Sequence, residues 1–594
     1  DGDAVADAGR ADALALPNGA EGLLGGEPGA GAGGERGKPG AGGSNAPAAG
    51  EKAVEGEQSK EPEQGKKDEV KPEAKVIRID TAAMNRRIVN VPVPPGSYTG
   101  LLAAKESLFY LANPSPGTRG GSNANRVLHV FDMAKREDSV VLTGITSYDL
   151  SASGEKIIYR AGQAFGIVDA KPNQKVGDGK LDLAGLEMRL DPRAEWRQIF
   201  DEAWRTERDF YYDPTMRGLD WAAVKERYAQ VLPFVAHRTD LNYLIGDMIG
   251  ELSTSHAYVF GGEMPEVARV ATGLVGADFE IRDGLYRFKK IYPGDNSAPE
   301  TRSPLTEPGV VVREGDYLLA VNGRPLRAGD NPFALFENTV GKQVTLRVND
   351  KPAEEGARLV TVRPIASDTT LRYLDWVENN RRKVWEATDG RCAYIHVPDT
   401  QVAGINAFFK AFYAQTDKDA LIVDARFNSG GFIPDFLAER LTRKVLEYDA
   451  PREGLDERYP QAAIYGPKVL VVNEYAGSGG DSIPDYFREA NIGPIVGRRT
   501  WGGLTGITGG LPMVDGGTVT APSVAAWRVE NGKSVWIVEN KGVLPDIDLD
   551  ARPDLVASGR DPQLEKAIGL INEQLTKNPP KHPRRPPYGP QPSQ

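Results

Sequence analysis

Cysteine, histidine and long hydrophobic runs are scarce in this sequence. Its 594 residues include one cysteine, Cys392, and five histidines. A single cysteine excludes an intrachain disulfide and fits a reducing compartment without proving one. The apolar neighbours of Cys392 predict a buried strand thiol rather than a nucleophile. No apolar run is long enough to span a bilayer, so we expect no membrane partner.

Positive charge is also in deficit. The chain has 72 Lys and Arg against 83 Asp and Glu, a formal net charge of -11 and a pI near 5.3. Proteins that bind nucleic acid neutralise phosphates with basic surfaces, so this balance argues against a nucleic-acid partner. The sequence contains no Gly-x-x-x-x-Gly-Lys phosphate loop and no His-Glu-x-x-His zinc helix. We therefore expect chemistry without a nucleotide or metal cofactor.

Aromatic residues are almost absent from the first 75 positions, which are rich in Gly, Ala, Glu, Lys and Pro. Such a composition cannot bury enough apolar surface to offset the entropy of ordering, so we expect residues 1–75 to be a disordered linker. Residues 576–594, rich in Pro, are expected to form a disordered tail. The chain starts at Asp1 with neither a methionine nor a signal-like segment, which predicts a fragment or a processed product.

The remaining length is enough for several domains. Residues 76–188 hold short β-like runs, such as Ser107 to Ala112, separated by Ser-Gly and Asn-Pro turns. This pattern predicts the terminal blades of a β-propeller. Residues 189–270 form a predicted helical core subdomain, in which Asp191 caps a helix that begins at Pro192.

Residues 271–367 alternate strands and turns. The string from Gly315 to Gly323 contains an Asn-Gly hairpin turn and resembles the PDZ fold. Such domains bind an extended chain end as an added strand, with backbone N–H groups holding its carboxylate. A small β module that binds nothing and acts as a lid or spacer is the alternative.

Residues 368–575 alternate buried strands with helices, which predicts an α/β core. The expected fold class is multidomain α/β with additional β domains. Among the individual elements, we expect a strand at Leu274 to Ile281 and helices at Thr239 to Leu252, Pro434 to Leu446 and Asp481 to Ala490.

Ser478 lies in the turn Ala476-Gly-Ser-Gly-Gly480, between the predicted strand Val469 to Val472 and a helix. A hydroxyl becomes a nucleophile when it is exposed at a tight turn, next to a base, with free backbone N–H groups that bind the oxyanion. The flanking glycines remove side chains that would block a substrate. Such turns also cradle phosphates or merely turn the chain, so the stretch alone is compatible with either role.

A base for this serine has few candidates among the five histidines. His256 follows a predicted helix end, in Ser253-Thr-Ser-His256, and precedes a pair of glycines. Because loops at element ends carry function, His256 is the best candidate. The other four lie in strands, before a helix and in the tail: His129, His396, His237 and His582.

A second loop can supply oxyanion contacts. After the strand Leu421 to Asp424, the backbone N–H of Gly430 or Gly431 can form an oxyanion hole together with that of Gly479. The polar residues between the strand and these glycines are expected to tie the turn together by hydrogen bonds. They are Asp424, Arg426 and Asn428.

A carboxylate is needed to orient the histidine and to stabilise its imidazolium form. Glu539 follows a predicted strand that includes Val535 and precedes Asn540, so it is a candidate. Carboxylates at strand ends are mostly solvated, and a surface role is the alternative.

Several stretches, taken in order, resemble the tricorn protease family of serine peptidases over about residues 76–575. Separated motifs in the correct order are far more specific than any one of them. The resemblance implies the end of a β-propeller, a helical core subdomain, a PDZ domain and an α/β, crotonase-like catalytic core. The stretches are Glu251 to Tyr258, the PDZ-like segment, Asp424 to Gly431, Asn473 to Asp481, Arg499 to Gly503 and Val538 to Asp546.

By that resemblance Ser478 is the nucleophile and His256 the general base, and Ser255 and Glu539 complete a tetrad that orients the imidazole. The resemblance also implies a cytoplasmic homo-oligomer, a hexamer, that degrades short or unfolded peptides through an acyl-enzyme. No cofactor is implied.

The resemblance further implies that Gly431 and Gly479 supply the oxyanion-binding N–H groups. Gly479 stands where the archaeal member has an aspartate, a change that leaves its N–H in place. Asp449 is similar to an aspartate that binds a basic P1 side chain, and a solvated loop carboxylate is the alternative.

Two other functions are alternatives. Carboxyl-terminal processing peptidases share the PDZ domain and the α/β core but use a serine and lysine pair. Their lysine corresponds to Gly503 in the string that begins at Gly497, which favours the histidine mechanism here. The other alternative is a noncatalytic PDZ-containing scaffold that binds peptides and has an inert core.

Overall fold

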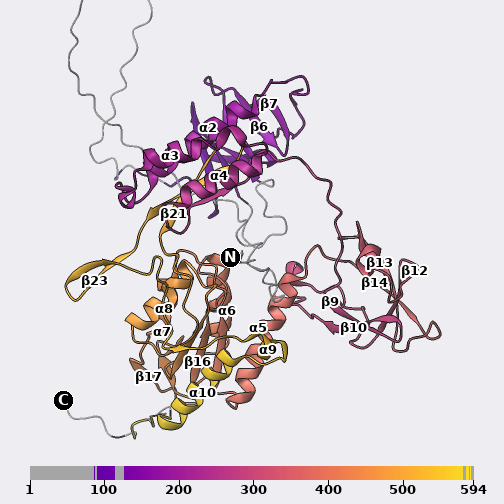
Figure 1. Cartoon of the computed structure of the whole chain (residues 1–594), viewed down its shortest axis with the longest axis vertical. Helices are drawn as coiled ribbons and strands as arrows, with labels where there is room; N and C mark the ends of the chain where they lie inside the picture. Colours follow the sequence, from indigo (N-terminus) through magenta and orange to yellow (C-terminus); the bar gives the residue numbers. More distant parts are fainter. Residues whose placement is uncertain are drawn as a thin grey trace, which may run out of the picture. The chain divides into compact units, whose positions relative to one another are not determined.

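Two compact units make up the described part of the chain (Figure 1). This computed structural model describes residues 86, 88, 90–113, 126–579, 583–587 and 589. One unit holds the described residues up to Leu190, and the other holds those from Asp191 onward. The predicted linker at residues 1–75 and much of the predicted tail, including His582, lie outside the described residues.

The first unit consists of two antiparallel sheets, with the strand orders β1-β2-β3-β4 and β5-β6-β7. Side chains alternate between the two faces of a strand, as in β6, where Ile157 and Tyr159 are buried and Ile158 is exposed. These sheets confirm the expected short antiparallel strands. The strands are β1 (Tyr98–Ala104), β2 (Ser107–Ala112), β3 (Arg126–Asp132), β4 (Glu137–Ile145), β5 (Ser147–Leu150), β6 (Lys156–Ala161) and β7 (Ala164–Asp169).

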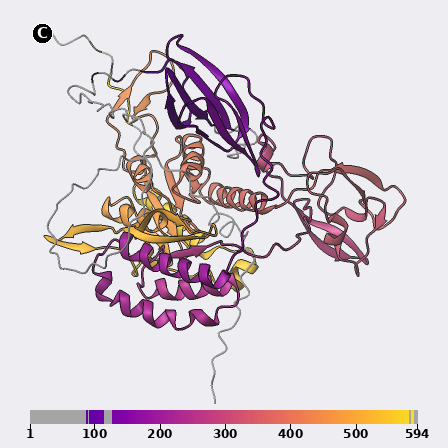
Figure 2. The same ribbon diagram turned by 90° about the horizontal axis from the view of Figure 1, so that it is seen from above.

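Three helices open the second unit and lie side by side (Figure 2). Asp191 caps the first of them as predicted, because its side chain accepts the N–H groups of Arg193 and Ala194. The helix predicted to reach Leu252 ends at Gly250. The apolar faces of the three helices pack into one buried core. The helices are α2 (Pro192–Phe210), α3 (Trp221–Ala229) and α4 (Arg238–Gly250).

A three-stranded antiparallel sheet fastens this helical region to the C-terminal part of the chain. β8 (Tyr258–Phe260) pairs with β22 (Thr518–Val524), which pairs with β21 (Gly506–Pro512). Val259 thus lies opposite Val519, a residue from the far end of the sequence. The pairing brings the loop that precedes β8 next to the loop that precedes β21.

The PDZ-like segment is an antiparallel sheet of order β14-β13-β11-β10-β9, with β12 beside β11. Asn322 and Gly323 have φ of 49° and 77° and form the predicted hairpin turn. The strand predicted from Leu274 begins three residues later, because Gly276 has a φ of 73° and Leu274 instead bridges Ile365. The strands are β9 (Ala277–Arg282), β10 (Leu285–Ile291), β11 (Tyr317–Val321), β12 (Arg324–Pro325), β13 (Val344–Asn349) and β14 (Arg358–Val362).

Five parallel strands in the order β15-β16-β19-β20-β25 form the centre of the α/β core. Helices α6, α7 and α8 pack on one face, and α5 and α10 pack on the other. The strands are therefore buried, as expected for a parallel sheet covered on both sides. The elements are α5 (Thr369–Ala387), β15 (Cys392–His396), α6 (Val402–Tyr413), β16 (Ala420–Asp424), α7 (Pro434–Leu441), β19 (Lys468–Val472), α8 (Gly479–Glu489), β20 (Ile495–Gly497), β25 (Ile547–Asp548) and α10 (Pro562–Lys577).

Two predicted helix boundaries in this core were wrong. α7 stops at Leu441, because Leu446 donates its N–H to Tyr459 O beside a small hairpin. α8 begins at Gly479, two residues before Asp481, so Ser478 is its N-cap. The other strands and α-helix of this unit are β17 (Glu447–Asp449), β18 (Glu457–Tyr459), β23 (Trp527–Glu530), β24 (Lys533–Trp536) and α9 (Pro553–Ala557).

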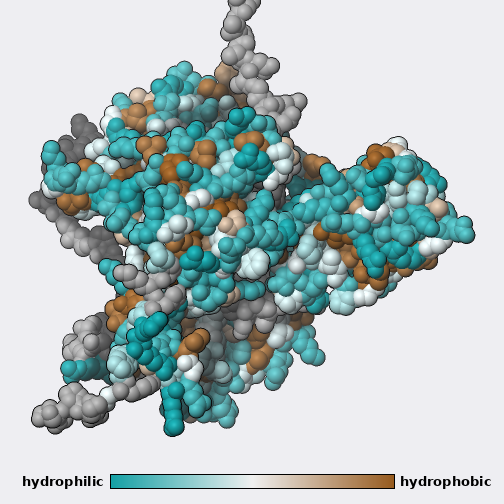
Figure 3. All heavy atoms as spheres, turned by 90° about the horizontal axis from the view of Figure 1, so that it is seen from below, coloured by the Kyte–Doolittle hydropathy of each residue, from teal (hydrophilic) through white to brown (hydrophobic). Residues whose placement is uncertain are grey.

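The described residues contain no helix that is long and apolar enough to cross a membrane. On the face drawn in Figure 3, apolar residues form separate spots among hydrophilic ones. The apolar residues of the core strands are instead buried, as in β16 and β19, where each residue is inaccessible or nearly so.

Glu207 is a buried acid inside the helical core whose carboxyl group has no hydrogen-bond partner among the described residues. Its side chain is fully buried in α2, and neither carboxyl oxygen has a hydrogen-bond partner in the described part of the chain. Because burial disfavours the charged form, the pKa of Glu207 is raised to about 8. The native protein therefore keeps this carboxyl protonated near neutral pH.

We expect Glu207→Gln to make the protein more stable than the wild type, by a margin that grows with pH. The unfolded acid ionises near pH 4.5 and the folded one near 8. Between these values the wild type loses up to about 1.4 kcal/mol of stability per pH unit, and Gln cannot ionise. Midpoints of thermal unfolding at pH 5.5, 7 and 8.5 measure the difference. Glu202→Gln, on the same helix at a partly exposed position, is the matched control, and a pH-independent gain for Glu207→Gln would contradict the assignment.

Candidate active site

Ser478 lies where the buried strand β19 passes through a turn into α8. Its backbone has φ of 56° and ψ of -117°, a conformation that residues with a Cβ rarely adopt. Its side chain remains partly exposed, whereas Gly477, Gly479 and Gly480 around it are buried. The turn therefore presents a hydroxyl at the surface with little side-chain bulk beside it.

Asp481 holds this turn in its strained form. Its buried carboxylate accepts the N–H groups of Ser478 at 2.9 Å, Gly502 at 2.8 Å and Gly503 at 3.0 Å, and the hydroxyl of Thr500. Burial raises the pKa of Asp481, although these hydrogen bonds oppose the shift. This role of Asp481 was not predicted from the sequence, although the Ser-x-x-Asp spacing of a helix capping box indicates it.

The loop after β16 presses against the serine turn. A Cβ on Gly430 would lie 2.6 Å from Ser478 Cβ, and one on Gly479 would lie 2.9 Å from Gly431 N. Only glycine fits such an approach. Neither Gly431 nor Gly479 donates its N–H to an acceptor within the described residues. Two free N–H groups thus lie side by side next to Ser478, one of them at the start of α8, where helices leave donors unused.

Thr400 lies behind these glycines. A Cβ on Gly479 would fall 2.1 Å from Thr400 Oγ1, and this hydroxyl is buried with no hydrogen-bond partner among the described residues. The threonine therefore contributes to the requirement for glycine at position 479. No sequence pattern pointed to it, because the contact joins the loop after β15 to the start of α8.

The polar residues before the glycine pair are structural, as predicted. The Arg426 guanidinium forms a buried ion pair with Asp424 at 2.7 Å. Asn428 donates to Val397 O at 2.8 Å and accepts the Gly430 N–H at 2.9 Å. These contacts fix the path of the loop.

His256, Ser255 and Glu539 form a hydrogen-bonded chain. Ser255 Oγ lies 2.9 Å from His256 Nδ1 and donates to Glu539 Oε2 at 3.1 Å, while Ser255 N–H donates to Glu539 Oε1 at 2.7 Å. A hydroxyl has one proton, and a carboxylate can only accept, so Ser255 Oγ accepts from Nδ1–H. This leaves the lone pair of the neutral imidazole on Nε2.

Glu539 is half-buried and well supplied with donors. Besides Ser255, the N–H groups of Leu504 and Thr505 donate to it at 2.8 and 2.7 Å. Burial alone would raise the pKa of Glu539, but the backbone N–H groups outweigh it and the pKa is lowered. The carboxylate is therefore charged at neutral pH. It is held by hydrogen bonds within the protein and is not simply a solvated carboxylate at the end of a strand.

The imidazole of His256 has a largely apolar environment. The rings of Tyr258 and Trp501 each lie with their centroids 5.9 Å from it. Burial lowers the pKa of His256, and the nearby charge of Glu539 opposes this only in part. The side chain is consequently neutral, as a general base must be, at neutral pH.

Gly503 joins the two halves of the site. Its carbonyl accepts the Ser478 N–H at 3.0 Å, and a Cβ on it would lie 2.9 Å from Ser255 Cβ and 2.3 Å from Trp501 Cζ3. Ser478 Oγ and His256 are not hydrogen-bonded to each other in the described structure, but both adjoin this residue or its neighbour Trp501. The sequence motif included Trp501 without indicating its contact with the histidine.

Asp449 lies outside this cluster. It is exposed at the end of β17, in a two-stranded hairpin with β18. No hydrogen bond or ion pair within the described residues connects it to the serine turn or to the histidine chain.

The cysteine and histidine side chains of Cys392, His396 and His237 have structural roles. Cys392 is buried in β15 as expected, and burial raises the pKa of its thiol to about 12. His396 is buried between Tyr373 Oη and Arg426 O, and His237 caps α4. Within the described residues, no group of three or more His, Cys, Asp and Glu side chains is arranged to hold a metal ion.

Comparison with protein families gives three matches along the chain. Residues 192–250 match the tricorn protease C1 domain, and residues 273–367 match the tricorn protease PDZ domain. Residues 391–549 match peptidase family S41. These matched spans are not domain boundaries, so the boundaries expected from the sequence stay predictions.

Individual relatives extend the similarity over most of the chain. It is 37% identical over 524 residues to tricorn protease homolog 1 of Streptomyces coelicolor, which covers 85% of this chain and 48% of that protein. It is 31% identical over 513 residues to the tricorn protease of Thermoplasma acidophilum, covering 85% and 47%. A crystal structure of the tricorn protease superposes with a TM-score of 0.73 at 30% identity, covering 81% of this chain and 47% of that one. The chain spans about half the length of these relatives.

Proposed function

Because the chain belongs to the tricorn protease family, we propose that it is a serine endopeptidase that cleaves short or unfolded peptides through an acyl-enzyme. The observation that carries this proposal is the hydrogen-bonded chain from Glu539 through Ser255 to His256, beside the strained turn of Ser478. A carboxylate, a relay and a neutral imidazole are the parts that activate a serine hydroxyl.

The proposed reaction begins with proton transfer from Ser478 Oγ to His256 Nε2 as Oγ forms a bond to the carbonyl carbon of the peptide. Gly431 and Gly479 donate their free N–H groups to the oxyanion. Collapse of the intermediate breaks the C–N bond, and the imidazolium returns its proton to the leaving amine. Water then hydrolyses the ester by the same steps, with His256 as the base.

The lack of space around Gly503 disfavours a mechanism that uses a serine and a lysine. A Cβ there would meet the Trp501 ring at 2.3 Å and Ser255 Cβ at 2.9 Å. A lysine side chain at this position therefore has no room beside the existing histidine chain, which supports the histidine mechanism over that of carboxyl-terminal processing peptidases.

The proposal includes a cytoplasmic homo-oligomer, a hexamer by family resemblance, with Asp449 as the residue that binds a basic P1 side chain. Asp449 is exposed, so its carboxylate is free to meet a cation from a peptide. A noncatalytic peptide-binding scaffold is the competing function, and labelling of Ser478 by a serine-directed reagent separates the two.

Ser478→Ala is expected to abolish peptide hydrolysis and to leave the folded structure unchanged. A serine-directed fluorophosphonate should label the wild-type protein at Ser478, identified by mass spectrometry, and should not label the variant. Ser429→Ala, in the neighbouring loop, is the matched control and should still be labelled. A protein that hydrolyses nothing and takes up no label would be a scaffold.

The pH dependence of kcat/KM is expected to have its acid limb below pH 6.5, the ordinary pKa of histidine, because burial lowers the pKa of His256. The base works only when it is unprotonated, so activity falls as the pH drops through the lowered pKa. Glu539→Gln removes a charge that raises this pKa, so the limb should move to still lower pH. Loss of orientation should also reduce kcat by about 10²-fold or more. Glu530→Gln serves as the control, and an unmoved limb in Glu539→Gln would oppose the proposed coupling.

Asp449→Asn is expected to lower kcat/KM for substrates with Arg or Lys at P1 by about 10-fold to 100-fold, since a charge-assisted hydrogen bond is worth about 1.5–3 kcal/mol. Substrates with an apolar P1 residue should react unchanged. Fluorogenic peptides that differ only at P1 measure this ratio, with Glu453→Gln as the matched control. An unchanged substrate profile would remove Asp449 from the specificity pocket.

A further inference from the structure

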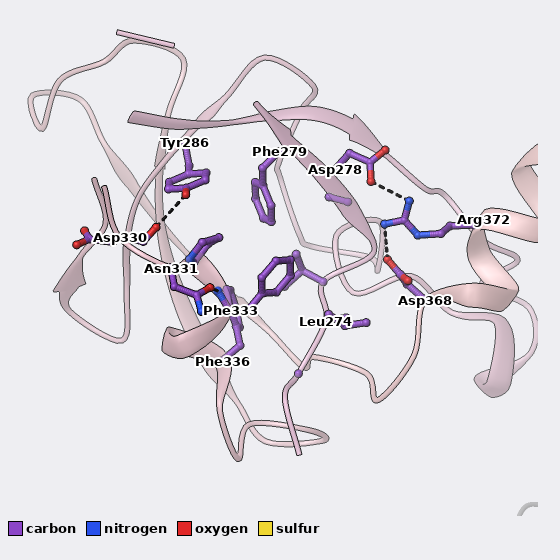
Figure 4. A pocket seen from close by; sticks show the side chains of 14 residues that line it. Leu274, Asp278, Phe279, Tyr286, Asp330, Asn331, Phe333, Phe336, Asp368 and Arg372 are labelled. Carbon is purple, nitrogen blue, oxygen red and sulfur yellow. Dashed lines mark hydrogen bonds and ion pairs between the residues drawn. The ribbon is translucent and has the colours of Figure 1, made fainter. Parts of the chain in front are cut away.

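Choice of the peptide bond to be cleaved depends on the side chains that surround Ser478. The PDZ-like sheet carries a cavity of about 670 Å³ (Figure 4), but none of the residues that line it belongs to the Ser478 cluster. Contacts with the two residues that flank the cleaved bond must instead come from side chains beside the serine. An exposed tryptophan lies there.

Trp501 rests against the turn that holds the serine. A Cβ on Gly477 would lie 2.5 Å from Trp501 Cε3, and a Cβ on Gly503 would meet Trp501 Cζ3. The Trp501 N–H donates to Ala476 O at 2.9 Å, which fixes the backbone that carries the ring. The side chain is nevertheless 47% exposed. It therefore presents apolar surface within one residue of Ser478.

The edge of the indole that carries Nε1 points away from these glycines, because Nε1 and Cε3 lie on opposite sides of the ring system. Within the described residues, the Nε1–H of Trp501 donates no hydrogen bond. The Nε1–H groups of Trp204 and Trp221 each donate to a backbone carbonyl, as is usual for an indole that is packed inside a fold. Trp501 thus has both ring surface and a donor available to a ligand.

Aromatic rings continue from Trp501 past the histidine. The ring centroids of Trp501 and Tyr258 each lie 5.9 Å from that of His256, and the centroid of Phe260 lies 5.5 Å from that of Tyr258. Tyr258 and Phe260 are two positions apart on β8, so they share one face of the strand, while Val259 on the other face packs against the helical core. Phe260 is 46% exposed. This face of β8 therefore extends the apolar surface.

The amine side of a bound peptide must lie at this surface. In the proposed reaction His256 returns its proton to the leaving amine, which must come within about 3.2 Å of Nε2. The Cα of the residue that carries this amine is only about 1.5 Å from the nitrogen. Its side chain therefore begins next to the imidazole, within reach of the rings of Trp501 and Tyr258. The carbonyl oxygen of the cleaved bond lies instead at Gly431 and Gly479.

A large apolar side chain fits these rings best. Aromatic pairs attract at centroid separations of about 4.5–7 Å, and covering an exposed ring removes apolar surface from water. Glu539 supplies the charge that acts on the imidazole, and its carboxylate already accepts hydrogen bonds from Ser255, Leu504 and Thr505. A charged side chain at this place would gain no unengaged partner from it.

We propose that Trp501 and Tyr258 form the subsite for the residue on the amine side of the cleaved bond, and that this subsite selects large apolar residues such as Phe. Trp501 is then a specificity-determining residue. The inference rests on the proposed peptidase function and adds to it a preference on the side of the bond opposite to the one assigned to Asp449.

Peptides that share the acyl part acetyl-Ala-Ala-Arg and differ only in the leaving residue test this preference. Phe, Gly, Lys and Glu are compared as leaving residues. We expect kcat/KM to be about 10-fold higher for Phe than for Gly in the wild type, and Trp501→Leu to reduce this ratio to about 3-fold or less. Both substrates meet the same enzyme, so a general loss of activity cancels in the ratio. Trp501→Phe, which keeps an aromatic ring, should restore most of it.

Acyl transfer measures the same subsite from the other direction. The acyl-enzyme is formed from acetyl-Ala-Ala-Arg methyl ester and captured by phenylalaninamide or glycinamide. The amine forms a C–N bond to the ester carbon, the bond to Ser478 Oγ breaks, and His256 carries the proton of the amine to Oγ. Because capture reverses acylation, the amine occupies the leaving-group position. At equal concentrations we expect about 10-fold more capture by phenylalaninamide, and loss of this advantage in Trp501→Leu.

Two controls separate this role from a structural one. Trp385→Leu removes a tryptophan that is 51% exposed on α5 and should leave both ratios unchanged. Fluorophosphonate, which carries no peptide on its leaving side, should label Trp501→Leu at Ser478 as it labels the wild type, which shows that the site is intact. If Trp501→Leu is not labelled, Tyr258→Leu replaces it and should lower the ratio of Phe to Gly about 3-fold.

Three results would overturn the inference while the peptidase function stands: equal rates for Phe and Gly in the wild type, a preference for Lys or Glu over Phe, or an unchanged ratio of Phe to Gly in whichever variant is labelled. A wild-type protein that neither hydrolyses these peptides nor takes up the label would refute the proposed function itself, and this inference with it.

Discussion

The antiparallel pairing of β8 with β22 is the constraint on which the candidate site depends. It sets Val259 opposite Val519, and Thr520 Oγ1 reinforces it by donating to His256 O at 2.7 Å. This pairing joins the helical region to the α/β core, although the whole PDZ-like segment lies between them in the sequence. The joining sheet allows a single carboxylate, Glu539, to accept hydrogen bonds from the N–H groups of both Ser255 and Leu504. A shift of this ladder by one residue would turn each strand side chain to the opposite face.

Four residues in and beside the candidate site have strained backbone conformations. His256, Ser478, Val538 and Asn540 all have positive φ, which is unfavourable for side chains with a Cβ and most of all for a β-branched one. Hydrogen bonds hold these residues in place: Asn540 donates its N–H to Gly502 O at 2.8 Å and its side chain to Ser253 O at 2.7 Å. Each such bond contributes about 1 kcal/mol, comparable to the strain it opposes. The serine and the histidine are thus held in their positions before any substrate is present.

Three carboxyl groups in this unit illustrate how environment sets protonation. Glu539 and Asp481 each accept hydrogen bonds from four donors, yet the pKa of Glu539 is lowered and that of Asp481 is raised. The difference follows from burial, since Asp481 is wholly enclosed and Glu539 only partly. Glu207 has burial without donors, and its pKa rises to about 8. Glu539, the partly solvated carboxylate with a lowered pKa, retains the charge that an imidazolium partner requires.

Local sequence determined much of this protein: the capped start of α2 at Asp191, the Asn322 hairpin turn, the buried strands, and the serine, histidine and glutamate as the candidate residues. These features follow from periodicity and turn chemistry, which act over a few residues, and from the order of motifs along the chain. Tertiary structure alone decided that Thr400 lies behind Gly479 and that Trp501 lies against the histidine. Each of these depends on contacts between segments that only folding brings together.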